Sequence, residues 1–198
     1  MVISIRKSSK ISRALCLFSA ITLLLTVGLL DSALAVTAEE IETRSDEALK
    51  RLYELEGGKE FANKAQGLLV LPKVGKGALI VGIEHGKGAL RVDGKTVDYY
   101  SLSAGSLGLQ IGGEAKAIII AFMTQESLEK FRASKNWEAG VDANIAMIKA
   151  GDGGSLSNIT GKEPIQAIVF GVKGLLLDLS LKGAKFSKLD ESKLDKKE

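Results

Sequence analysis

Five basic residues fall within a stretch of 23 residues and could together hold an anion. Only Glu84 and Asp93 oppose them there, and several glycines stand beside them. Ammonium and guanidinium groups next to exposed backbone N–H groups are suited to binding phosphate. The solvated face of a β-hairpin gives the same pattern, and from the charges alone it is the simpler interpretation. This set, called the basic cluster below, consists of Lys73, Lys76, Lys87, Arg91 and Lys95.

Residue types that support catalysis are scarce. His85 is the only histidine and Cys16 the only cysteine, so catalytic triads and His or Cys metal sites lack the residues they need. Residues 82–87 are one residue short of a phosphate-binding P-loop. Glu138 and Asp142 could form the carboxylate pair of a hydrolase, but such a pair is more typical of a solvated strand face. We therefore expect no enzyme activity, no catalytic residue, no metal, no cofactor and no bound nucleotide.

The first 35 residues have the features of a targeting segment. Four basic residues precede an apolar run over residues 14–30, and Ala33-Leu34-Ala35 then supplies a small-x-small cleavage pattern. We predict a cleaved signal peptide over residues 1–35, with Val36 as the first mature residue. An uncleaved membrane anchor is the alternative, because the apolar run lies at the lower edge of a spanning length. Cys16 precedes most of the apolar run, which is unlike a lipoprotein signal.

Composition describes an ordinary folded protein with room for one domain. The chain has 198 residues, of which 45% are hydrophobic and 26% charged. Residues 1–35 hold four basic residues and one acidic residue, so the formal net charge of +3 falls to zero without them. A neutral mature chain gives no support for nucleic-acid binding. A mature chain without cysteine fits a periplasmic or secreted protein, and we predict that localisation without a lipid anchor.

Helical periodicity predicts three helices. Thr37 is the expected N-cap of the first, with Glu40 reaching back to complete a capping box, and Thr124 is the expected N-cap of the last. The first helix is amphipathic, and its acidic polar face would be repelled by anionic lipid, so we expect it to pack on a sheet. The predicted helices cover residues 38–56, 59–66 and 125–133.

Period-two alternation and short apolar runs predict strands in the remaining chain. The repeated segments GKGALIV at 75–81 and GKGALRV at 86–92 predict a hairpin with its turn near residues 84–87. Two runs, at 117–123 and 165–170, are apolar nearly throughout and are typical of strands covered on both faces. Half-buried strands are predicted over residues 107–112, 138–147 and 175–182, with a short strand over 68–71 that Pro72 ends.

The glycines within these strand patterns favour bends and close backbone approach. The predicted fold class is therefore α+β, with a curved, Gly-rich, mostly antiparallel β-sheet, an N-terminal amphipathic helix and a short mid-chain helix. Charged residues from Ser187 onward predict a frayed tail.

Three segments resemble the SYLF lipid-binding domain family, whose members include yeast actin-binding proteins associated with SH3 domains. The resemblance spans residues 40–190, and the segments occur in the same order as in the family. The chain resembles the bacterial exported branch of the family, because it carries a signal-like segment and no SH3 region. The segments are residues 88–101, residues 122–142, and residues 170–189.

The resemblance implies a single non-enzymatic domain over residues 36–190, followed by a charged tail over 191–198, that associates with phospholipid. Eukaryotic members bind phosphoinositides and act on actin and membranes. We predict an exported protein of the cell envelope that binds phospholipid or another amphiphile. The basic cluster would contact headgroups, and apolar sheet edges or a cavity would take acyl chains. The alternative is a periplasmic protein-interaction or envelope-stress protein that does not bind lipid directly.

Overall fold

The computed structural model describes residues 36–76, 83–105, 116–148, 156, 163–171, 174–175 and 181–194. All of them belong to one compact unit, Val36–Asp195. The predicted signal peptide, the strand predicted over 107–112 and most of the strand predicted over 175–182 lie outside the described residues. Among the described residues, no helix has the length and apolar content needed to cross a membrane.

Three α-helices of the described chain lie close to their predicted positions. They are α2 (Ala38–Glu54), α3 (Gly58–Lys64) and α4 (Gln125–Ala133). Thr37 caps α2 by accepting the backbone N–H of Glu40, and Thr124 caps α4 by accepting that of Ser127. The second half of the predicted capping box is wrong, because the Glu40 carboxylate pairs with Arg44 one turn further along the helix.

The strands form a single sheet in the order β5-β9-β3-β2-β1-β4-β7-β6, with β8 paired to β7. Every pairing is antiparallel except that of β6 with β7. The sheet is curled, so the predicted fold class is confirmed. The strands are β1 (Gly67–Lys76), β2 (Ile83–Val92), β3 (Lys95–Gly105), β4 (Lys116–Phe122), β5 (Asn136–Glu138), β6 (Ala146–Met147), β7 (Ile165–Gly171), β8 (Gly174–Leu175) and β9 (Lys185–Leu189).

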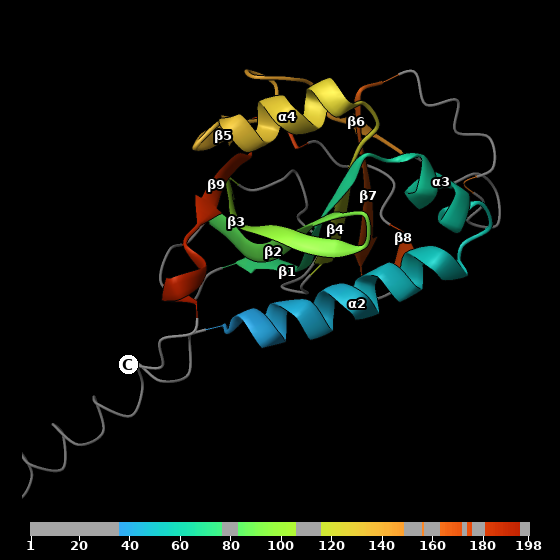
Figure 1. Ribbon diagram of the computed structural model, residues 1–198, viewed down its shortest axis with the longest axis horizontal. Coiled ribbons are helices and arrows are strands. Elements are labelled where there is room, and N and C mark those ends of the chain that lie inside the picture. The colour runs from blue at the N-terminus through green and yellow to red at the C-terminus, as the bar shows by residue number, and fades with distance from the viewer. Residues whose placement is uncertain are drawn as a thin grey trace, which may run out of the picture. The chain divides into compact units, whose positions relative to one another are not determined.

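Helices cover the sheet on both sides, with α4 on one face and α2 on the other (Figure 1). On the face toward α4, called the α4 face, Phe131 meets Tyr100, Phe122, Trp137 and Phe186 at ring-centroid distances of 4.6–6.0 Å. Rings at these separations fill a core tightly. On the opposite α2 face, the apolar stripe of α2 packs on side chains of β1, β2, β3, β4 and β7. The central strands β4 and β7 are buried on both faces, as their apolar sequences predict.

The β1–β2 hairpin differs from its prediction in two ways. Pro72 does not end the strand, because the register of β1 shifts around it on both sides and a bulge accommodates the missing N–H group. The expected turn residues 84–87 lie inside β2, where Lys76 of β1 pairs with Glu84. The connection therefore falls between residues 76 and 83.

Two further predictions near the C-terminal half are wrong. The alternation over 138–147 is interrupted by a turn, in which Gly140 has a φ of 86° and the Asp142 carboxylate accepts the backbone N–H of Glu138 at 2.6 Å. The tail predicted from Ser187 starts inside β9, which pairs with both β3 and β5. A short 3-10 turn, η2 (Glu191–Lys193), follows, and Leu194 is buried against α2 and β3.

Candidate anion-binding surface

Sheet register brings two lysines of the basic cluster directly opposite each other. Lys73 of β1 pairs with Lys87 of β2, and residues that pair across antiparallel strands share one face. Lys87 is two residues from Ala89, which packs beneath α2, so both lysines lie on the α2 face. The helix crosses the sheet nearer to Ala89 and Arg91, and it leaves Lys73 exposed and Lys87 half-buried.

Polar side chains continue this uncovered region across the sheet. Lys87 pairs with Ser101 of β3, and the exposed His85 pairs with Ser103 in the next row. The Ser101 hydroxyl donates to the Ser187 carbonyl of β9 at 3.3 Å. We call this region the open patch, and it consists of Lys73, His85, Lys87, Ser101 and Ser103.

The two acidic residues that interrupt the basic cluster in sequence are absent from the open patch. Glu84 points to the α4 face, where its carboxylate lies 2.6 Å from the Lys116 ammonium and both side chains are 5% exposed. Asp93 occupies the turn at the far end of β2, with a φ of 50°. Neither Lys73 nor Lys87 has an ion pair with any residue that the structure describes. Like charges directly opposite each other cost a sheet on the order of half a kcal/mol, so an anion bound here would relieve repulsion.

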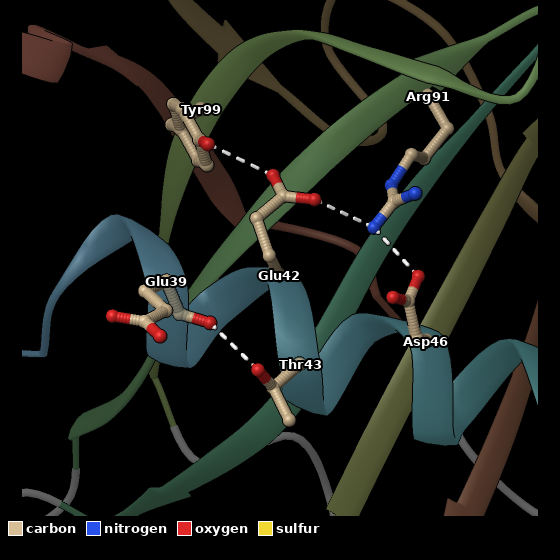
Figure 2. A network of polar contacts seen from close by, with 6 residues as sticks. All are labelled: Glu39, Glu42, Thr43, Asp46, Arg91 and Tyr99. Atoms are coloured by element: carbon tan, nitrogen blue, oxygen red, sulfur yellow. Dashed lines mark hydrogen bonds and ion pairs between the residues drawn. The ribbon is translucent and has the colours of Figure 1, made fainter.

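Arg91 lies on the same face but under α2, and its charge is already neutralised. Its Nη2 atom lies 2.7 Å from a Glu42 carboxylate oxygen and 2.8 Å from one of Asp46, and its side chain is 13% exposed. The Tyr99 hydroxyl donates to the other Glu42 oxygen at 2.8 Å (Figure 2). On the helix itself, Thr43 donates to the Glu39 carbonyl. This network fastens α2 to β2 and β3, so Arg91 has a structural contact and stands apart from Lys73 and Lys87.

The other two members of the basic cluster are also separated from the lysine pair. Lys95 is exposed and begins β3 after the turn at Asp93-Gly94, five residues of β2 beyond Lys87, which is about 17 Å along an extended strand. Lys76 ends β1 at the opposite end of the hairpin, where its backbone pairs with Glu84. The structure therefore brings together Lys73 and Lys87 and distributes the other three along the hairpin.

A cavity of about 570 Å³ lies beside the Arg91 network, between α2, α3 and the start of β1. Its walls carry charges of both signs, from Asp46 and Asp93 and from Lys50 and Arg91. A long acyl chain would meet these charged groups, so the cavity does not match the apolar site that the sequence suggested.

The remaining candidate residues have structural contacts. Besides the turn contact of Asp142, the Glu138 carboxylate lies 3.6 Å from the Lys185 ammonium. Because Asp142 lies in the turn that follows β5, the two carboxylates do not share a strand face. Within the described part of the chain, no group of three or more metal-ligating side chains lies close enough to hold a metal ion.

Sequence reasoning missed Ser101 and Ser103, although a signal for them exists. Residues 100–105 alternate between buried and less buried positions, with Leu102 and Ala104 on the α4 face. That period-two pattern assigns both serines to the face of Tyr99. What the sequence could not give is their pairing with Lys87 and His85, because register depends on the strand partner.

A family model matches part of the chain. Residues 103–193 match the family described as Las17-binding protein actin regulator, or Ysc84. This family contains the SYLF domain, so the SYLF assignment made from the sequence is confirmed over that range, from the end of β3 to η2. No curated protein matches the chain. The matched range includes Ser103, whereas Lys73, His85, Lys87 and Ser101 precede it.

Proposed function

We propose that this protein is exported and binds phospholipid or a related amphiphile at the cell envelope, without enzymatic activity. The signal-like residues 1–35 and the cysteine-free remainder of the chain support export. The SYLF domain supports lipid association. If residues 1–35 are removed during export, the mass of the protein recovered from cells will correspond to a chain that starts at Val36. A mass that retains residues 1–35 would contradict cleavage.

The observation that carries the proposal is the pair formed by Lys73 and Lys87 on an uncovered part of the sheet. Two ammonium groups without a described acidic partner attract an anionic surface, and each lysine near such a surface contributes about 1 kcal/mol. The α4 face is already filled by the rings around Phe131. We therefore propose contact with headgroups at the surface of a membrane, with the acyl chains remaining in the bilayer.

The distribution of charged residues suggests how the protein would be oriented on a membrane. The outer side of α2 carries acidic residues, among them Glu39, Glu47 and Glu54, and these are repelled by anionic lipid. The open patch lies toward the end of the hairpin that contains Lys76 and His85, away from the Arg91 network. The protein would therefore approach the membrane with this end of the β1–β2 hairpin.

The test is vesicle co-sedimentation of residues 36–198, which contain every described residue. Binding to anionic vesicles that weakens as salt rises, together with weak binding to zwitterionic vesicles, is the expected result. Binding that is equal for both vesicle types and resists salt would show acyl-chain burial and would contradict the headgroup mechanism.

A protein partner is the second candidate, because the matched family is described by its binding to another protein. Failure of residues 36–198 to sediment with either vesicle type would favour this candidate. Recovery of a stable protein complex free of lipid from the cell envelope would then support it.

A further inference from the structure

The cavity beside the Arg91 network has the size of a small-molecule site. Its volume of about 570 Å³ lies within the usual range of such pockets, about 300–1,000 Å³. Helix α2, the end of α3 with the start of β1, and the turn Asp93-Gly94 between β2 and β3 all contribute to its wall. The φ values of the two turn residues are 50° and 74°, as in the tight two-residue turns that Asp-Gly favours, and this turn fixes where Asp93 stands.

Two charged groups of the cavity wall are available to a ligand. The Lys50 ammonium belongs to α2 and the Asp93 carboxylate to the turn, and neither has an ion pair or hydrogen bond with any residue that the structure describes. The other two charged residues of the wall, Asp46 and Arg91, pair with each other at 2.8 Å. A ligand that carries one charge of each sign would therefore complement Lys50 and Asp93.

The same wall holds two side-chain amides. Asn63 of α3 and Gln66, which precedes β1, are both exposed, and their amide groups have no hydrogen bond within the described part of the chain. An amide offers both a donor and an acceptor, so each can pair with the N–H or C=O group of a peptide bond. The buried residues Leu49 and Leu68 give the wall an apolar part that suits a small aliphatic side chain.

We propose that this cavity binds a short peptide with free termini and small aliphatic side chains. Lys50 holds the terminal carboxylate, Asp93 holds the terminal ammonium, and the two amides pair with the peptide groups between the termini. A single amino acid lacks the peptide groups that the amides match, and the interior of a protein chain lacks the terminal charges. The inference goes beyond the proposed function, because the residues of the open patch do not line the cavity.

The test is an NMR titration of isotope-labelled residues 36–198 with trialanine, with N-acetylated trialanine and with C-amidated trialanine. We expect trialanine to shift the backbone amide signals of Asn63 and Gly94, which lie on different parts of the wall. We also expect it to bind at least about fivefold more tightly than either blocked form, the factor that one favourable ion pair supplies.

Two conservative variants assign each terminus to its partner. Asp93→Asn keeps the turn, because Asn-Gly favours the same turn type, and it should abolish the difference between trialanine and its N-acetylated form. Lys50→Gln, at an exposed helix position, should abolish the difference between trialanine and its C-amidated form. The matched controls Glu47→Gln and Lys59→Gln change exposed charges outside the cavity wall and should keep both differences.

The contrary results are distinct. Equal binding of all three peptides, or unchanged signals at Asn63 and Gly94, would overturn the peptide site. A difference that survives in Asp93→Asn or in Lys50→Gln would show that the terminus contacts another group and would overturn its assignment. Vesicle co-sedimentation tests the proposed function separately, because these two variants leave the open patch unchanged.

Discussion

Lys87 and Arg91 stand four residues apart on the same face of β2, yet the structure gives them opposite surroundings. Arg91 lies beneath α2, where Glu42 and Asp46 neutralise it and the hydroxyl of Tyr99 completes the network. Lys87 lies beyond the helix, opposite another lysine and without a described acidic partner. The comparison shows that a basic residue becomes a structural contact or a candidate binding group according to what an element distant in sequence places over it.

Removal of Arg91 is the strongest way to test this contrast. The substitution Arg91→Met keeps much of the apolar stem and leaves two carboxylates without their cation. We expect the free energy of unfolding to fall by about 2 kcal/mol, as measured by urea denaturation. The control Lys95→Met, at an exposed position, should change it by less than about 0.5 kcal/mol. An Arg91→Met variant as stable as the parent would mean that the network does not hold α2 in place.

The sequence could predict this division only in part. The bounds of α4 follow from a local capping residue and two inward-facing apolar residues, Leu128 and Phe131, so local pattern suffices there. The partners of Arg91 are 45 and 49 residues away in sequence, and no local pattern connects them. The sequence therefore assigns Arg91 to the basic cluster only because of its charge and its position in the stretch.

The turn at residues 139–142 shows a second limit. Apolar residues alternate there as in a strand, but Gly140 adopts a left-handed conformation and Asp142 accepts a backbone N–H group. These local turn contacts outweigh the alternation, and Val141 is left 74% exposed as a result.

Tyr100 extends the comparison to a polar group on the α4 face. Its hydroxyl is buried and has no hydrogen-bond partner within the described part of the chain, while its ring lies 4.6 Å from that of Phe131. We expect Tyr100→Phe to keep the ring contact and to raise the free energy of unfolding by about 1 kcal/mol at pH 8. A destabilised variant would show that the hydroxyl has a partner.

The same residue gives the fold a dependence on alkaline pH. Burial, helped by the nearby Asp98 carboxylate, raises the pKa of Tyr100 to about 12, whereas an unfolded tyrosine titrates near pH 10. The folded state therefore disfavours ionisation of Tyr100, and the free energy of unfolding is unaffected by this group below about pH 10 and falls as the pH rises from about 10 to 12. Across that interval, the free energy of unfolding of the parent protein should fall relative to that of Tyr100→Phe.

Lys87→Gln tests the repulsion in the open patch and has the smallest expected effect. The substitution removes one of two like charges that face each other, so we expect it to raise the free energy of unfolding by about 0.5 kcal/mol at low salt. This gain should shrink as salt screens the pair in the parent protein. A loss of stability at low salt would show that Lys87 has a stabilising contact.

The most direct measurement places a reporter on the open patch itself. Residues 36–198 contain no cysteine, so single cysteines can be introduced at Ser103 in the open patch and at the exposed Ala133 on α4, without changing any charge. An environment-sensitive fluorophore at position 103 should respond to anionic vesicles, and the response should disappear in Lys73→Gln/Lys87→Gln. The same fluorophore at position 133 should remain unchanged. A response at position 133 without one at position 103 would contradict the assignment of the open patch as the membrane contact.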